Sequence, residues 1–289
     1  MKYIFLGTPT FATIILEKLI NSGFPPVLLV CNPDKPVGRN KIITPPPIKS
    51  IAENNDIKVW QPQKLDLNSW NSKLKEIGEV DVAIIAAYSK IISKDILDTL
   101  NGKFIGVHPS LLPKHRGASP IQQTILDGDA ETGVTLFFVD EKVDHGKIIS
   151  NTKYQTSSND TYKLLEDKLA RISGELLLSL LQNPNTDKLG AEEQNHIKAT
   201  LTKKFKTEDG LVDLKKDNSE IIARKIRALN PEPGVYTIQN NSPPAFAGMA
   251  QSGKRLKLLE VKKSVDGWVI TKTQLEGKKP KADRINLTK

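Results

Sequence analysis

Cysteine is almost missing from this sequence of 289 residues, since Cys31 is the only one. A chain with a single cysteine forms no internal disulfide, and a lone thiol inside the apolar stretch Val27–Cys31 is typical of a reduced, intracellular protein. No base lies near Cys31 in the sequence, which argues against a nucleophilic role. We therefore interpret Cys31 as a core residue.

Long apolar runs are also missing. No stretch approaches the roughly 20 residues that a membrane-spanning helix needs. The apolar run Tyr3–Leu6 behind Met1 and Lys2 is too short for the apolar core of a signal peptide. With 38% hydrophobic and 26% charged residues, the composition fits a soluble globular protein. We expect a cytoplasmic protein that acts as a monomer.

Two common motif spacings are absent as well. Gly7 ends a short strand but is followed by Thr8, Pro9 and Thr10, without the further glycines of a dinucleotide-binding loop, so NAD binding is excluded. No H-E-x-x-H or C-x-x-C spacing is present. Although His115, His145 and Asp140 could suggest a metal, we therefore expect none.

Positive charge is confined to the last third of the chain. Residues 1–199 hold 23 Lys and Arg against 23 Asp and Glu, whereas residues 200–289 hold 19 basic and 10 acidic residues. The whole net charge of +9 therefore lies in the second segment. A basic module behind a neutral one suggests a polyanion bound by the tail, although a merely lysine-rich surface would give the same count.

Short apolar strands alternate with helical segments in the first part of the chain. Strands are predicted at Tyr3–Leu6, Val27–Cys31, Lys58–Trp60, Val80–Ala87 and Phe104–His108, and helices at Phe11–Asn21 and Ile48–Glu53. This alternation predicts an α/β fold with a Rossmann-like, mostly parallel sheet and right-handed crossovers. In such sheets ligands bind beyond the carboxyl ends of the strands.

The rest of the chain changes character after a long helix. We predict strands at Thr132–Asp140 and Gly146–Tyr154, helices at Thr161–Leu181 and Ser219–Leu229, and short β-stretches at Val235–Ile238, Lys257–Val261 and Trp268–Thr273. The polar stretch between the two helices favours a linker. These features predict a first domain at residues 1–182, a linker at 183–203 and a smaller β-barrel domain at 204–289.

His108 is the first candidate for chemistry. It ends a buried strand and is followed by a loop that Pro109, Pro113 and Pro120 stiffen, because each proline fixes φ and removes a donor. A stiff loop at the carboxyl edge of a parallel sheet is suited to a site. The alternative is a core histidine satisfied by backbone groups, and its place at a strand end favours function.

Asp144 is the second candidate. It follows a predicted strand, beside His145 and Gly146. A carboxylate near a histidine can orient the imidazole and stabilise its protonated form. Spacing alone does not show that Asp144 and His108 meet.

Motifs along the whole chain resemble the methionyl-tRNA formyltransferase family. They are G-T-P-T-F-A (Gly7–Ala12), N-P-D-K-P-V-G-R (Asn32–Arg39), A-A-Y-S (Ala86–Ser89), H-P-S-L-L-P-K-H-R-G-A-S-P-I-Q (His108–Gln122), G-D-A-E-T-G-V-T (Gly128–Thr135), V-D-H-G (Val143–Gly146), R-A-L-N-P-E-P-G (Arg227–Gly234) and L-E-G-K-K-P (Leu275–Pro280). The histidine and aspartate motifs are shared by folate formyltransferases in general, and the others narrow the resemblance to the tRNA enzymes.

The resemblance implies a transferase that moves a formyl group from 10-formyltetrahydrofolate to initiator methionyl-tRNA for translation initiation. It implies that His108 and Asp144 act in the transfer. The residues expected to bind the folate are Ser110, Leu111, Leu112, Pro113, Ala87, Tyr88 and Asp140. Those expected to bind tRNA are Arg39, Lys41, Lys203, Lys204, Arg224 and Arg227.

One residue departs from the family pattern. The resemblance implies an asparagine two residues before the histidine, whose amide holds the formyl oxygen as it becomes an oxyanion, but here that residue is Gly106. Three hypotheses follow: a slow enzyme, a water or another side chain in the place of the amide, or a tRNA-binding homologue with weakened catalysis. Losing one oxyanion donor typically costs about 10² to 10³ in rate.

Other formyltransferase classes remain as alternatives. The same core could formylate a small amine, such as a purine precursor or an amino sugar, or hydrolyse formylfolate. Neither reaction needs a basic β-domain. Truncation after about Asn183 is therefore expected to spare a small-molecule enzyme and to weaken a tRNA enzyme.

Overall fold

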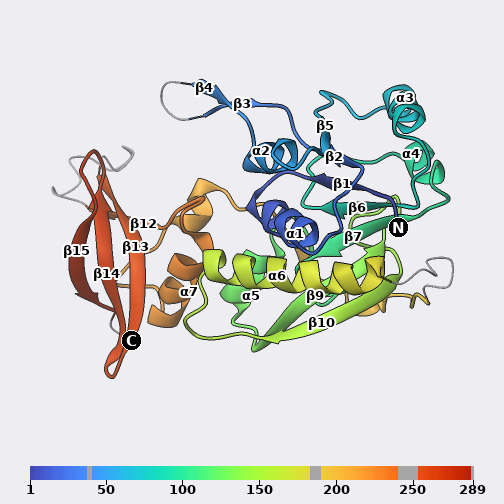
Figure 1. Ribbon diagram of the computed structural model, residues 1–289. Coiled ribbons are helices and arrows are strands. Elements are labelled where there is room, and N and C mark those ends of the chain that lie inside the picture. Colours follow the sequence, from blue (N-terminus) through green and yellow to red (C-terminus); the bar gives the residue numbers. More distant parts are fainter. Residues whose placement is uncertain (38–40, 183–189, 240–252, 288–289) are drawn as a thin grey trace, which may run out of the picture. The chain divides into compact units, whose positions relative to one another are not determined.

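The structure is a computed structural model that describes residues 1–37, 41–182, 190–239 and 253–287 (Figure 1). Its contacts divide the chain into two units. The first unit holds residues 1–117, 131–155 and 166–201, and the second holds residues 118–130, 156–165 and 202–289. None of the helices in the described ranges combines the length and apolar character that crossing a lipid bilayer requires.

A mixed sheet of seven strands forms the centre of the first unit, in the order β10-β9-β7-β6-β1-β2-β5. The strands are β1 (Tyr3–Gly7), β2 (Leu28–Val30), β5 (Lys58–Trp60), β6 (Val82–Ala86), β7 (Phe104–His108), β9 (Glu131–Phe138) and β10 (Ile148–Gln155). The strands from β5 to β7 are parallel, and β9 and β10 are antiparallel to their neighbours. The predicted mostly parallel sheet is confirmed.

Helices of the first unit cover this sheet, and they are α1 (Thr10–Asn21), α2 (Pro47–Glu53), α3 (Leu67–Ile77), α4 (Lys94–Asp98) and most of α6 (Tyr162–Leu181). Helix α1 buries Ile15, Leu16 and Leu19 completely, which explains its apolar spacing. Helix α3 was not predicted from the sequence. It begins at Asp66, whose carboxylate accepts the N–H of Ser69 at 3.0 Å and caps the helix.

The core of the first unit lies between the sheet and these helices. Fully buried side chains from β1, β2, α3 and β7 meet there, including Leu6, Val30, Trp70 and Phe104. Cys31 is buried next to this layer, and burial raises its pKa to about 11. A thiol with a raised pKa is a poor nucleophile, in agreement with a structural role.

The second unit combines helices α5 (Pro120–Asp127) and α7 (Ser219–Leu229) with an antiparallel sheet. The sheet has the order β12-β13-β14-β15 and is made of β12 (Tyr236–Gln239), β13 (Lys254–Ser264), β14 (Gly267–Leu275) and β15 (Lys281–Asn286). Its strands appear in red and orange in Figure 1. The sequence had predicted a small all-β module here, and the described residues form this four-stranded sheet.

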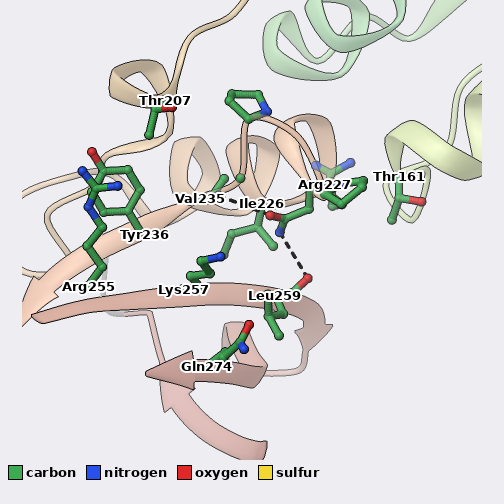
Figure 2. Close-up of a pocket in the computed structure, with 14 residues that line it drawn as sticks. Thr161, Thr207, Ile226, Arg227, Val235, Tyr236, Arg255, Lys257, Leu259 and Gln274 are labelled. Atoms are coloured by element: carbon green, nitrogen blue, oxygen red, sulfur yellow. Dashed lines mark hydrogen bonds between the residues drawn. The ribbon is translucent and has the colours of Figure 1, made fainter. Parts of the chain in front are cut away.

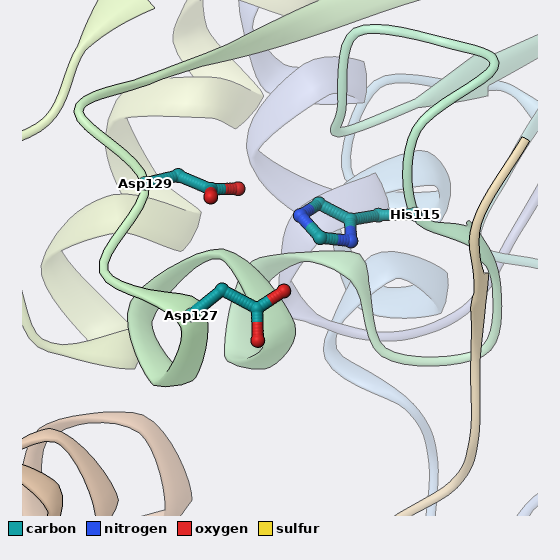
Figure 3. A group of neighbouring side chains, drawn as sticks. All are labelled: His115, Asp127 and Asp129. Atoms are coloured by element: carbon teal, nitrogen blue, oxygen red, sulfur yellow. The ribbon is translucent and has the colours of Figure 1, made fainter. Parts of the chain in front are cut away.

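Helix α5 ends at a left-handed cap. Asp127 and Asp129 (Figure 3) flank Gly128, whose φ of +68° most residues adopt only with strain. Arg224 of α7 donates to the carbonyl of Asp127 at 2.8 Å and satisfies this end of α5. The remaining short elements are β3 (Lys35–Val37), β4 (Ile42–Thr44), β8 (Arg116–Gly117), β11 (Leu201–Thr202) and the 3₁₀ turns η2 (His196–Lys198) and η3 (Thr207–Gly210).

Candidate active site

His108 is the last residue of β7 and is only 5% exposed. One ring nitrogen, Nε2, lies 2.8 Å from the carbonyl oxygen of His115. Because a carbonyl only accepts, Nε2 must carry a hydrogen and donate it. The other nitrogen, Nδ1, lies 3.5 Å from Oδ2 of Asp144. The structure therefore brings together the two residues that spacing alone could not join.

Asp144 does not follow a strand that ends, like β7, at the carboxyl edge of the parallel strands. Strand β9 runs against β7, so that Phe138 pairs with Ile105 and β9 ends beside the start of β7. The following loop then returns along the sheet to His108. Its Gly146 lies so close to the chain that a Cβ would be 1.8 Å from the carbonyl oxygen of Phe138. Only glycine fits this return path.

The loop after His108 is fixed by internal hydrogen bonds. The hydroxyl of Ser110 donates to the carbonyl of Lys114 at 2.6 Å. The hydroxyl of Thr135 donates to the carbonyl of Ser110 at 2.7 Å and accepts the N–H of Leu112 at 3.1 Å. Ser110 is fully buried, so its hydroxyl serves the loop rather than solvent. The stiffness predicted from the prolines thus has a polar contribution too.

Some residues other than glycine at this site have positive φ angles, as do Lys41, Asp56 and Asn101 elsewhere in the described chain. Ala87, His115 and Asp144 have φ values of +50°, +60° and +48°. Residues other than glycine take up such conformations at a cost of order 1–3 kcal/mol each, and they cluster at functional sites. Two of these residues contact the candidate catalytic groups: His115 through its carbonyl, and Asp144 as a member of the pair.

The remaining residues expected to bind folate occupy different surroundings. Leu112 is buried, whereas Leu111 and Pro113 are partly exposed on the same loop. Asp140 accepts from Nδ1 of His145 at 2.7 Å and from the N–H of Lys142 at 2.9 Å, so its carboxylate already serves the Asp144 loop.

Tyr88 carries an unusual hydroxyl. The oxygen is buried, and no hydrogen-bond partner is found for it in the part of the chain that the structure describes. Burial raises the pKa of the Tyr88 phenol to about 12, so the group stays neutral. A buried hydroxyl without a partner is costly, which makes Tyr88 a candidate for contact with a bound molecule.

Gly106 is covered by an aromatic ring. It pairs directly with Phe137 across β7 and β9, and the Phe137 side chain faces the same side of the sheet as that of His108. A Cβ at Gly106 would lie 2.3 Å from Cε1 of Phe137. The ring of Phe137 therefore occupies space that a side chain at position 106 would need, but it offers no conventional N–H or O–H donor to an oxyanion.

The basic loop after β2 is only partly described. Arg39 lies outside the described residues, and Lys41 is exposed with a φ of +49°. The start of the loop is well held, because the carboxylate of Asp34 accepts from Lys49 at 3.0 Å and from the Gln61 amide at 2.7 Å.

The basic residues expected in the C-terminal part divide into two kinds. Lys203 and Lys204 are exposed, and Lys203 pairs with Asp209 at 2.6 Å. Arg224 pairs with Glu220 at 3.1 Å and caps α5, as described above. Arg227 is 8% exposed, lies over the ring of Trp268, and has its pKa lowered by burial. Both arginines thus have structural contacts.

A cavity of about 550 Å³ lies in the second unit between the end of α7 and the sheet (Figure 2). Its charged lining residues in the described ranges are all cations: Arg227, Arg255 and Lys257. Arg255 lies over the ring of Tyr236, with 4.7 Å between the guanidinium and the ring centroid. Nε of Arg227 is buried and finds no acceptor among the described residues. No pattern in the sequence predicted this cavity.

A buried polar group beside Asp144 was not predicted from the sequence. Gln194, which lies in the predicted linker, is 4% exposed and donates to the carbonyls of Asp144 and Gly146. Its polar surroundings in the sequence gave no apolar period from which burial could be predicted.

Comparison with known proteins agrees with this architecture. Residues 1–181 match the formyl transferase family and residues 204–282 match the formyl transferase C-terminal domain. A methionyl-tRNA formyltransferase of Thermotoga maritima is 37% identical over 241 residues, which cover 83% of this chain and 76% of that protein. One from Listeria innocua is 35% identical over 293 residues, covering 98% and 93%.

Solved structures share the fold at lower identity. An N-formyltransferase from Helicobacter canadensis, in complex with folinic acid and dTDP-3-aminofucose, superposes with a TM-score of 0.61 at 20% identity, covering 99% of this chain and all of that one. The two domain matches follow one another along the chain. Together with the relatives named above, they confirm the resemblance and the enzyme class inferred from the motifs. The chain belongs to the methionyl-tRNA formyltransferase family.

Proposed function

We propose that this enzyme transfers the formyl group of 10-formyltetrahydrofolate to the α-amine of methionine on initiator methionyl-tRNA, for translation initiation. The observation that carries the proposal is the pairing of buried His108, at the end of β7, with partly buried Asp144, in the loop after β9, at 3.5 Å in a chain of this family. We further propose that it acts in the cytoplasm as a monomer.

The chemistry is a direct acyl transfer. The free amine attacks the formyl carbon, a tetrahedral oxyanion forms, and its collapse breaks the bond to the folate nitrogen. The amine loses one proton and the leaving nitrogen gains one. Asp144 accepts the first proton through a water, and His108 returns a proton on the leaving side. The contact between Nε2 and the His115 carbonyl leaves Nδ1 as the nitrogen of His108 that faces Asp144.

Stabilisation of the oxyanion then falls on His108. With Nε2 donating to the carbonyl of His115, Nδ1 is the ring nitrogen left to act on the oxyanion, and the Asp144 carboxylate 3.5 Å away orients it. Gly106 and Phe137 are both buried on this part of the sheet, where a low dielectric strengthens such electrostatic interactions.

The folate site we propose comprises the loop residues Ser110, Leu111, Leu112 and Pro113 together with Ala87, Tyr88 and Asp140. Tyr88 supports this assignment, because a bound molecule with a polar group would satisfy its buried hydroxyl. Ser110 and Asp140 contribute by holding the two loops in shape.

The tRNA contacts we propose are Arg39, Lys41, Lys203 and Lys204, with Arg255 and Lys257 at the cavity of the second unit. Exposed cations neutralise phosphates, and release of counterions makes such binding depend steeply on salt. We propose only an indirect role in tRNA binding for Arg224 and Arg227, because both form ion pairs with Glu220. Tight tRNA binding that does not change between low and high salt would contradict this part.

The test is incubation of the full chain with formylfolate and charged initiator tRNA, followed by detection of formylmethionine. We expect turnover by the wild type and its loss in His108→Ala. Formylation of a small amine but not of the charged tRNA would overturn the proposal in favour of a small-molecule enzyme. Salt-dependent tRNA binding without turnover would support the weakened homologue that Gly106 and Phe137 suggest.

A further inference from the structure

Residues 182–203 lie between the two family matches and belong to neither. Part of this stretch, Gln194–Thr200, nevertheless belongs to the first unit. We call it the 194–200 segment. It touches the supports of both His108 and Asp144.

Gln194 forms hydrogen bonds with the loop that carries Asp144. Its side-chain amide donates to the carbonyl of Asp144 at 3.0 Å and to that of Gly146 at 2.7 Å, on either side of His145. Its amide oxygen accepts from Nε and Nη2 of Arg116 at 3.1 and 2.6 Å. All donor and acceptor capacity of this amide is therefore used, in a place that is 4% exposed.

Thr200 holds the histidine loop in a similar way. Its hydroxyl oxygen accepts the N–H of His115 at 2.8 Å, and its carbonyl accepts the N–H of Arg116 at 2.9 Å. The carbonyl of His115 is the group that accepts from Nε2 of His108. Thr200 therefore fixes the peptide that orients the imidazole.

Arg116 and His196 connect the contacts made by Gln194 with those made by Thr200. Nη2 of Arg116 lies 2.9 Å from Nδ1 of His196, which accepts because a guanidinium only donates. The ring of His196 stacks on that of His145, with centroids 4.2 Å apart and planes 3° apart. His145 is the neighbour of Asp144 in the returning loop, so this stack braces the same loop from a second side.

We propose that Gln194 and Thr200 are positioning residues for formyl transfer, Gln194 acting through Asp144 and Thr200 through His108. The inference deepens the proposed function and rests on it. Its physical basis is that Asp144 is held at a strained φ of +48° on a loop that has left the sheet. A displacement of about 1 Å at a reacting group can cost 10²-fold in rate.

Truncation cannot test this inference, because removal of residues after Asn183 deletes the 194–200 segment along with the C-terminal unit. Point variants of the full chain are needed. Gln194→Leu removes both donors and the acceptor. Gln194→Glu keeps an oxygen for Arg116 but places a second acceptor against two carbonyls, and it serves as the milder variant if leucine prevents folding.

The first measurement is the kinetics of formylation. We expect Gln194→Leu, Gln194→Glu and Thr200→Val to lower kcat by about 10-fold to 10²-fold, with KM for tRNA and folate within twofold of wild type. The matched control is Ile197→Ala, since this side chain is 97% exposed and lies in the same segment. Unchanged kcat in folded Gln194 variants, or an equal loss in Ile197→Ala, overturns the proposal.

A double-mutant cycle separates positioning from simple destabilisation. In an Asp144→Ala background the carboxylate is gone, so Gln194→Glu should cause no further loss of kcat. Independent, multiplicative losses would mean that Gln194 does not act through Asp144, and would overturn its role.

Amide hydrogen exchange gives a readout that does not need activity. The N–H of Gly117 donates to Oδ2 of Asp144 at 2.7 Å and so reports where the carboxylate is. We expect at least tenfold faster exchange at Gly117 in Gln194→Glu, and no change in Ile197→Ala. If the wild type formylates no tRNA, the proposed function fails, but the exchange experiment still tests the role of Gln194. Unchanged protection of the Gly117 N–H in Gln194→Glu would overturn that role.

Discussion

In the first unit, His108 and Arg116 are 5% and 6% exposed, and their polar atoms contact other groups of the same unit. In the second unit, Lys203 has a side chain that is 66% exposed, and Arg255 and Lys257 are exposed beside a cavity. Buried, oriented charges stabilise a transition state, because they need no reorganisation when charge develops. Exposed cations attract a polyanion at long range. Substitutions at the buried site of the first unit should therefore change kcat, and those at the exposed cations of the second unit should change tRNA affinity and its salt dependence.

The largest effect is expected for Asp144→Asn. The amide keeps the shape of the side chain but carries no negative charge beside His108 and cannot accept the amine proton. We expect kcat to fall by about 10²-fold to 10⁴-fold, the range for loss of a general acid or base. Steady-state formylation assays measure this, with salt-dependent tRNA binding as the control that should not move. A loss of less than threefold would place proton transfer on another group.

The next effect concerns Gly106. Gly106→Asn alone drives a side chain into Phe137, where even a Cβ lies 2.3 Å from the ring, so we expect it to destabilise the fold by roughly 1–3 kcal/mol and to leave kcat no higher. Phe137→Ala makes room, and the double variant should then exceed Phe137→Ala in kcat by up to about 10²-fold. Thermal unfolding and formylation rates measure both. A gain in kcat from Gly106→Asn alone would contradict the packing argument.

At this site the position of His108 could be predicted from the sequence, but the path of the chain to Asp144 could not. Strand β7 was predicted with the bounds that the structure shows. A short, uninterrupted apolar run between polar residues is typical of a buried strand. That placement put His108 at the carboxyl edge of the sheet. Asp144 does lie beside His108, but the path of the chain to it was not predicted, since the reversal of β9 against β7 depends on contacts between distant residues.

The supports of the site show the same limit more sharply. Phe137 meets Gly106 only through the register of two strands, and Gln194 meets Asp144 across 50 residues of sequence. Neither contact leaves a periodic or spaced pattern. Gln194 was assigned to a linker because its neighbours are polar, and polar residues that are buried through hydrogen bonds look the same in a sequence as exposed ones.

The comparison of the units predicts a third, smaller effect. Arg255→Ala and Lys257→Ala should each lower the slope of log affinity against log salt by about 1 and weaken tRNA binding, with kcat at saturating tRNA unchanged. Lys262→Ala is the matched control, because it is an exposed lysine on the same strand that does not line the cavity. Binding isotherms at several salt concentrations measure the slope. Equal effects of all three substitutions would mean that net charge alone matters.

The smallest effect is expected at Asp34, a partly exposed carboxylate at the start of the basic loop that is held by hydrogen bonds. The hydrogen bond from Gln61 is the main cause that lowers its pKa below 3.8, followed by the bond from Lys49. A carboxylate with a depressed pKa in the folded state contributes stability above the unfolded value, and this contribution is lost as pH falls through the folded pKa. Gln61→Leu should therefore move the Asp34 pKa up toward its usual value and flatten the decline in melting temperature below pH 3.8.

Carboxyl NMR titration of Asp34 measures that shift, with Gln63→Leu as the exposed neighbouring control. Because the side chain of Asp34 is partly exposed, its interactions are screened by solvent and the change in melting temperature at pH 7 should be small. The consequence for tRNA should also be small, since Gln61 only anchors the loop through Asp34 and the carbonyl of Asn32, at 2.7 and 2.8 Å. A loss of tRNA affinity in Gln61→Leu as large as that in Lys257→Ala would show that loop geometry, as well as exposed charge, determines how the chain binds RNA.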